Sequence, residues 1–251
     1  TGISGLKYTA NAFQKAGLDT FGVNVPDDKI LVKTVNGIKI AILGFSYGFN
    51  GIEASISQSD YDKYLNDLDM AKVEKKIKAA EKIADLTIVM PQSGEEYSLE
   101  PTPEQERIYR HIIDFGADIV FGGHPHVAEP TETIEKDGEK KFIIYSMGNL
   151  LSNQRYETLE NYWTERGVIM EVQVAKKDGK TSLTGVKAHP TWVSREPINR
   201  TFLGYPAYDY QVYLAEDYIK GGKYFDKIPL EKQQRIETAY HEMMDLLNIK
   251  F

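Results

Sequence analysis

Cysteine is absent from the 251-residue sequence, which excludes disulfide bonds, thiolate metal sites and cysteine nucleophiles. Basic residues are fewer than acidic ones: the sequence has 30 Lys and Arg and 37 Asp and Glu, so the net charge is −7 at pH 7. Nucleic acids and anionic lipid normally require a basic surface, so we expect no nucleic-acid partner. No apolar run approaches the ~20 residues of a transmembrane helix, and any membrane anchor is expected outside this sequence.

The remaining pattern is typical of a soluble α/β protein, with 41% hydrophobic and 27% charged residues. Helical periodicity alternates with short apolar runs, which predicts helices packed on a buried parallel sheet. The dipeptides Asn36-Gly37, Asp137-Gly138 and Asp178-Gly179 predict three antiparallel hairpins. Helices are predicted at Leu6–Ala16, Leu68–Ala84, Pro101–Phe115 and Glu231–Leu247, and strands at Phe21–Val25, Ile30–Val35, Ile38–Phe45, Leu86–Met90, Ile119–Phe121, Thr131–Glu135, Lys141–Tyr145, Gly167–Ala175 and Ser182–His189.

Two regions differ in composition. Residues 1–194 carry the alternating pattern and are predicted to form the main domain. Residues 195–251 are rich in tyrosine and more polar, which favours a helical extension packed on that domain.

Three polar segments each follow a predicted buried strand: residues 91–97, 122–127 and 145–150. In open α/β sheets the ligand crevice lies at the carboxyl ends of the strands. The three segments are therefore expected to meet in one cleft.

His124 and His126 give the sharpest signal in these segments, because they straddle Pro125 directly after two glycines. Proline stiffens the loop, and neutral imidazoles suit divalent ions such as Zn, Fe, Ni and Mn. We predict that both histidines are metal ligands and catalytic residues, with one of them able to protonate a leaving group. The alternative is a surface loop with two incidental histidines.

Four other residues of these segments are candidates on weaker grounds. Gln92 offers an amide oxygen to a metal ion or its bound water. Glu95, Tyr97 and Asn149 are predicted to bind substrate. Each also has a structural reading: Glu95 as a solvated charge, Tyr97 as packing at the rim, and Asn149 as a residue that orients its turn.

The segment Gly116–Val127 resembles the GAD-x-V-x-G-x-HPHV signature of the CapA family of poly-γ-glutamate capsule biosynthesis proteins. Tyr145–Asn149 is similar to the family's YSLGN, and Asn36–Ala41 to its NG-x-KIA hairpin. The resemblance extends to about Val193. It implies a four-layer α/β/β/α metallophosphoesterase-like sandwich with mixed sheets, and a metal centre at Gln92, His124 and His126.

Two departures from the family pattern bear on that metal centre. Gln92-Ser93 stands where the family has His-Trp, so an amide replaces one imidazole ligand. The family's earlier motifs, an Asp-containing strand end and an NNH segment, are expected before Thr1. We therefore expect the N-terminal strands of the family domain to be missing from this sequence.

The resemblance implies a function in poly-γ-glutamate synthesis or export, on an extracytoplasmic protein anchored in the cell membrane beside the membrane proteins of the capsule synthase. One hypothesis is a metal-dependent hydrolase acting on a phosphoester or amide with Mn, Fe, Zn or Mg. A second is a non-catalytic scaffold or carrier for an anionic polymer. A third is a calcineurin-like phosphodiesterase or nucleotidase unrelated to capsule.

Overall fold

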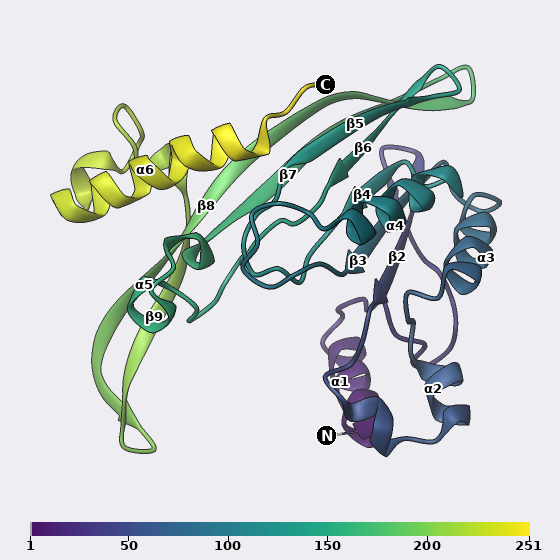
Figure 1. Ribbon diagram of the computed structural model, residues 1–251, viewed down its shortest axis with the longest axis horizontal. Helices are drawn as coiled ribbons and strands as arrows, with labels where there is room; N and C mark the ends of the chain where they lie inside the picture. Colours follow the sequence, from purple (N-terminus) through teal and green to yellow (C-terminus); the bar gives the residue numbers. More distant parts are fainter. Residues whose placement is uncertain (1) are drawn as a thin grey trace.

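The computed structural model describes residues 2–251, and a six-stranded mixed sheet in the order β1-β2-β3-β4-β6-β5 forms its centre (Figure 1). Strands β2, β3, β4 and β6 are parallel, whereas β1 and β5 pair antiparallel at the two edges. The parallel strands therefore all deliver their following loops to the same end of the sheet. The strands are β1 (Leu31–Val35), β2 (Ile38–Ser46), β3 (Leu86–Gln92), β4 (Ile119–Phe121), β5 (Thr131–Lys136) and β6 (Glu139–Ile144).

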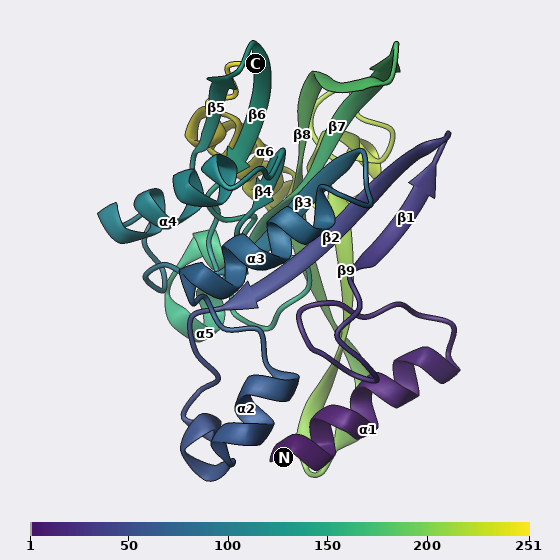
Figure 2. The ribbon, with the colours of Figure 1, turned by 90° about the vertical axis from the view of Figure 1, so that its right-hand side faces the viewer.

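Helices α3 (Met70–Ala80) and α4 (Pro103–Asp114) cover one face of this sheet (Figure 2). Their apolar residues recur at helical spacing, and Ile77 and Ile112 are fully buried against the strands. Helix α4 begins with a reciprocal capping box, in which Thr102 and Gln105 each accept a hydrogen bond from the other's backbone N–H. This helix is therefore fixed at the end nearest the polar loops.

A three-stranded antiparallel sheet, in the order β7-β8-β9, packs against the other face. Its strands are β7 (Arg166–Lys177), β8 (Lys180–Phe202) and β9 (Tyr205–Leu214). Strand β8 pairs with β7 along its first part and with β9 along its second part. Helix α6 (Leu230–Leu247) packs against β8 around the buried Trp192.

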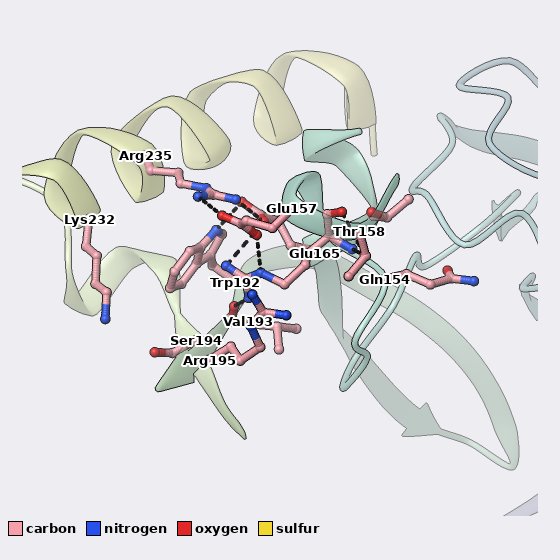
Figure 3. A network of polar contacts seen from close by, with 12 residues as sticks. Gln154, Glu157, Thr158, Glu165, Trp192, Val193, Ser194, Arg195, Lys232 and Arg235 are labelled. Carbon is pink, nitrogen blue, oxygen red and sulfur yellow. Dashed lines mark hydrogen bonds and ion pairs between the residues drawn. The ribbon is translucent and has the colours of Figure 1, made fainter. Parts of the chain in front are cut away.

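A buried ionic cluster joins α6 to the segment that precedes β7 (Figure 3). The fully buried Glu165 accepts hydrogen bonds from the Trp192 indole N–H, at 2.8 Å, and from the guanidinium of Arg235 in α6. Arg155 lies 3.6 Å from the same carboxylate, and its Nη1 donates to the Val193 carbonyl. We call these four residues, Arg155, Glu165, Trp192 and Arg235, the Glu165 cluster.

The α/β class with mixed sheets is confirmed, as are the three hairpins and the parallel core. The predicted strand at Phe21–Val25 is wrong: only Val23 forms a single bridge, to Leu65. Strand β8 continues across the predicted boundary between residues 194 and 195, and residues 195–251 contain β9 besides α6. The other helices are α1 (Gly2–Lys15), α2 (Gln58–Tyr64) and α5 (Tyr156–Leu159). Within residues 2–251 no helix is long and apolar enough to cross a membrane.

Candidate functional site

The three polar segments lie side by side at the carboxyl end of the parallel strands. Gly123 N–H donates to the Pro91 carbonyl, and Met147 N–H donates to the Gly122 carbonyl, both at 3.0 Å. Further bridges pair Gln92 with Gly123 and Ala128 with Met147. The loops after β3, β4 and β6 are thus hydrogen-bonded to one another, as the rule for parallel strand ends predicts.

Two glycines make this close approach of the loops sterically feasible. A Cβ on Gly122 would lie 1.9 Å from the Tyr145 carbonyl oxygen, and one on Gly123 would lie 2.7 Å from the Gln92 amide nitrogen. Both distances are far below van der Waals contact. The pair before His124 therefore allows the histidine loop, residues 122–127, to lie against its neighbours.

The histidine loop is conformationally strained. His124 and His126 have φ angles of 105° and 62°, and Tyr97, on the neighbouring loop, has 67°. Residues with a side chain rarely adopt positive φ, at a cost of roughly 1–3 kcal/mol each, and such residues concentrate at functional sites. Tyr97 is held there by its N–H, which donates to the Pro125 carbonyl at 2.8 Å.

Asn149 fixes the tautomer of His126. The Asn149 Nδ2 donates to the Thr164 carbonyl at 2.9 Å, and a carbonyl can only accept. The amide oxygen must therefore face the imidazole, and Asn149 Oδ1 lies 3.0 Å from His126 Nδ1. It follows that Nδ1 carries a proton, so that in the neutral imidazole the lone pair is on Nε2.

Tyr97 and Gln154 complete the surroundings of His126. The Tyr97 ring stacks on the imidazole with centroids 6.0 Å apart. Gln154 accepts a hydrogen bond from Asn149 Nδ2 at 3.2 Å and donates from Nε2 to the Tyr97 hydroxyl at 3.3 Å. The ring of His126 is thus oriented by a hydrogen bond from one neighbouring loop and by stacking from another, and Gln154 links the two.

His124 lies beside Tyr47, with ring centroids 4.6 Å apart, and 6.4 Å from the centroid of His126. Burial lowers the pKa of His124; Glu96 acts in the opposite direction and His126 adds to the lowering. The imidazole is therefore neutral at pH 7, the state in which it can bind a metal ion.

Glu95 and Tyr47 both line a cavity of about 510 Å³. Asp67, Asp69 and Glu104 also line this cavity, and its described lining includes no Lys or Arg. Tyr47 contacts both this cavity and His124, so the acidic cavity and the histidine loop are neighbours.

The predicted site residues thus divide into two groups. His124, His126, Tyr97 and Asn149 form one connected set, with Gln92 beside Gly123, and we call these five residues the histidine site. Glu95 belongs to the acidic cavity.

The sequence prediction missed three contributors to the histidine site. Tyr47 follows the end of β2 and could have been found from the strand-end rule. Gln154 lies in an irregular segment and Thr164 in a short 3-10 helix (Tyr162–Glu165), and a backbone carbonyl carries no sequence signal.

A buried carboxyl group lies behind the histidine loop. Glu129 is fully buried; its Oε2 accepts a hydrogen bond from Gln105 Nε2 at 2.6 Å, and its Oε1 has no hydrogen-bond partner among the described residues. Burial raises the pKa of Glu129 to about 7, although the Gln105 bond opposes the shift. The group therefore titrates near neutral pH.

The donor atoms of the histidine site are of the types that bind divalent cations, but they are fewer than a complete coordination shell requires. His126 Nε2, His124 and the Gln92 amide oxygen are suitable donors. With metal–nitrogen distances of about 2.1 Å, two rings on one ion have centroids at most about 6.5 Å apart, so 6.4 Å is near the limit. Residues 2–251 contain no group of three His, Asp or Glu side chains that could hold an ion, so further donors would be needed.

Comparison with known proteins points to bacterial capsule synthesis. A family model described as bacterial capsule synthesis protein PGA_cap matches residues 1–154. The capsule biosynthesis protein CapA of Bacillus anthracis is 34% identical over 189 residues, which cover 74% of this chain and 43% of that protein. The PGA biosynthesis protein CapA of Bacillus subtilis (strain 168) is 32% identical over 162 residues, which cover 61% of this chain and 40% of that protein. The chain therefore spans less than half the length of these curated relatives.

Solved structures resemble the chain more loosely. A putative 5'-nucleotidase from Staphylococcus aureus, in complex with alpha-ketoglutarate, superposes with a TM-score of 0.45 at 13% identity, over 74% of this chain and 35% of that chain. The calcineurin-like phosphoesterase YfkN from Bacillus subtilis superposes with a TM-score of 0.38 at 14% identity, over 64% of this chain and 49% of that chain.

Proposed function

The chain belongs to the PGA_cap family of bacterial capsule synthesis proteins, and from this premise we propose that the histidine site is a metal-dependent hydrolytic centre acting on an anionic substrate. The substrate would be the poly-γ-glutamate polymer or a phosphoester. In this proposal the protein works outside the cytoplasm, anchored in the cell membrane beside the capsule synthase.

The observation that carries the proposal is the fixed tautomer of His126. A histidine with only a packing role does not require a fixed orientation of its ring. Here Nδ1 of His126 donates to the Asn149 amide oxygen, and the Asn149 amide nitrogen in turn donates to the Thr164 carbonyl. A neutral imidazole with Nδ1–H donated to an oxygen and Nε2 left as a base is the arrangement of metal-bound histidines, whose second nitrogen is normally hydrogen-bonded. The same arrangement suits a general base.

The residues that would hold the ion are His126, through Nε2, together with His124 and Gln92. A divalent cation there would lower the pKa of a bound water and attract an anionic substrate. The protein's own part is to lower the pKa of His124 by burial, to orient His126 through Asn149, and to stack Tyr97 over the ring of His126.

The local charge also favours a cation. Glu96 is close enough to act on the pKa of His124, and the neighbouring cavity is lined by four carboxylates. The Lys72 ammonium, which lies near this cavity, is already paired with Asp67 at 3.0 Å. An anionic polymer approaching such a surface is repelled unless a bound cation offsets the charge.

The second candidate function is a scaffold or carrier that binds the polymer without cleaving it. Gln92 favours it, because an amide is a weaker ligand than imidazole for borderline metals, as does the small number of donors. A carrier of this kind would bind poly-γ-glutamate without turnover.

Calorimetric titration with Mn²⁺ and Zn²⁺, and hydrolysis of bis(p-nitrophenyl) phosphate and of poly-γ-glutamate, test the proposal. Asn149→Ala is expected to weaken metal binding about 10–100-fold, the usual effect of losing a group that orients a ligand. Asn153→Ala is the matched control: it lies four residues away and bonds to Arg195 and Tyr210 instead. Polymer binding without any metal binding or turnover would refute the hydrolase and support the carrier.

A further inference from the structure

The β8–β9 hairpin differs from the other three hairpins in the chemistry of its turn. All four turns are two-residue connections with positive φ at both residues, the geometry that favours Asn, Asp or Gly at the first position and Gly at the second. Three of them follow this preference and the fourth has leucine. The turns are Asn36-Gly37, Asp137-Gly138, Asp178-Gly179 and Leu203-Gly204.

Leu203 is unfavourable in its position on two counts. Its φ is 50°, a conformation that a leucine side chain disfavours sterically. Its side chain is also 82% exposed, so no packing within the protein compensates. A residue that breaks the local preference and gains nothing in the folded chain indicates a function outside folding.

The neighbours of Leu203 extend the apolar surface. Phe202 and Tyr205 are directly opposite each other across the hairpin and are 73% and 76% exposed. All residues from 197 to 206 are exposed. The end of this hairpin therefore projects from the body of the protein, as Figure 1 shows for the long loop at the lower left. We call residues 202–205 the hairpin tip.

From this geometry we infer that the hairpin tip inserts into the lipid–water interface of a membrane. A tip of three large side chains is far smaller than the ~800 Å² per partner of a stable protein interface. Phenylalanine, leucine and tyrosine are the side chains that partition into that interface, with the tyrosine hydroxyl left in water.

The charge of the hairpin end agrees with a membrane as the occupant. Between residues 197 and 208 the only charged side chain is Arg200, so this end of the hairpin has a charge of +1. The net charge of the chain is −7, so the other residues together have a charge of −8. The tip is thus the part of an acidic protein that a bilayer surface does not repel. Insertion is driven by apolar burial, so it depends more on the tip side chains than on lipid charge.

The test is flotation of the protein with vesicles of phosphatidylcholine, with and without phosphatidylglycerol. The wild type is expected to float with both, and the triple variant F202S/L203N/Y205S to show a partition coefficient lower by about tenfold or more. Asn at position 203 suits the turn, so the variant keeps the fold, which a thermal melt checks. The matched control is Tyr8→Ser, an equally exposed ring in α1, 77% exposed, which is expected to leave flotation unchanged.

A second readout places the tip itself in the lipid. The two native tryptophans lie at positions 163 and 192, away from the tip, so Leu203→Trp adds a local probe. Brominated lipid is expected to quench its added emission. Absence of flotation by the wild type, equal flotation by the triple variant, or no quenching of the probe would each overturn the inference. So would tip-dependent self-association in sedimentation velocity without vesicle binding, which would make the tip a protein contact.

Discussion

Two fully buried carboxyl groups, Glu165 and Glu129, have opposite surroundings. Glu165 accepts hydrogen bonds from an indole N–H and a guanidinium, with a second guanidinium nearby. Glu129 has one amide donor and one oxygen without a partner among the described residues. The first is surrounded by donors that compensate a negative charge. The second lacks a partner for one of its oxygens among the described residues, and it follows the histidine loop by two residues in the chain.

Charge compensation and backbone strain are distributed unequally between the two ends of the molecule. The Glu165 cluster ties the C-terminal helix to the small sheet, and its charges are compensated (Figure 3). The histidine site contains residues with positive φ angles, and Glu129, close to it in the chain, is a buried acid with only one hydrogen-bond donor. Strain and unmet polar groups concentrate at functional sites, so the contrast separates the structural end of the molecule from the candidate functional end.

The same substitution at the two positions should act with opposite sign. Glu165→Gln is expected to destabilise the protein by about 3–5 kcal/mol, because Arg235 and Arg155 would lose the charge that compensates them in a buried position. Glu129→Gln, measured above pH 7, should be neutral or stabilising. Urea unfolding gives the change in the free energy of unfolding for each variant relative to the wild type. Equal losses of stability in both variants would contradict the distinction between the two carboxyl groups.

The pH dependence of stability should show Glu129 directly. Its pKa is raised to about 7 in the folded protein from 4.5, so the folded state binds the proton more tightly. Stability is therefore fully present below pH 4.5 and falls as pH rises through 7, by at most about 3 kcal/mol. Unfolding free energies across this range should fall in the wild type and stay flatter in Glu129→Gln; parallel profiles would contradict the assignment.

Gln105→Met is expected to remove the one hydrogen bond that stabilises the charge of Glu129. The methionine keeps the length of the side chain but removes the donor to Glu129 and to the Tyr145 carbonyl. We expect a loss of about 2 kcal/mol, and a further rise in the pKa of Glu129 that moves the pH-dependent loss upward. Unfolding measured at pH 5 and pH 8 separates these two effects. A loss without any upward displacement of the pH profile would count against the role given to this bond.

Glu157→Gln tests a more exposed carboxylate that bonds to two members of the Glu165 cluster, Arg155 and Arg235, and should have the smallest effect. Although burial opposes it, hydrogen bonds from Arg235 and Arg155 lower the pKa of Glu157 to about 2. Its contribution is therefore present above pH 4.5 and is lost as pH falls through 2, the opposite direction to Glu129. Because the side chain is 39% exposed, solvent screening limits the loss to under about 1 kcal/mol at pH 7. A loss of unfolding free energy equal to that of Glu165→Gln would show that solvent exposure does not determine the order of these effects.

Much of the core could be predicted from the sequence, since periodicity and turn residues report local structure. Strand β4 covers the same residues, Ile119–Phe121, that the apolar run predicts. The meeting of the three polar loops followed from the parallel strand order alone. His124, His126 and Asn149 were selected as candidates because their residue types stand out at strand ends, and the structure brings them together.

The features that escaped prediction lack a local signal. Residues 197–202 of β8 are all exposed, and β9 contains exposed and half-buried residues in no regular alternation, so no period of two marks these segments in the sequence. Glu129 looks like a solvated loop acid in the sequence, and only tertiary packing buries it. The roles of the site residues, in contrast, stay predictions until metal binding is measured.

Thr164 and Glu165 are neighbours in the chain, yet they serve different ends of the molecule. The carbonyl of Thr164 sets the amide of Asn149, and thereby the proton position on His126. The carboxylate of Glu165 holds the C-terminal helix. The peptide unit between these two residues therefore contributes to both features: its carbonyl orients a side chain that bonds to the imidazole, and the residue that follows it anchors the 18-residue C-terminal helix.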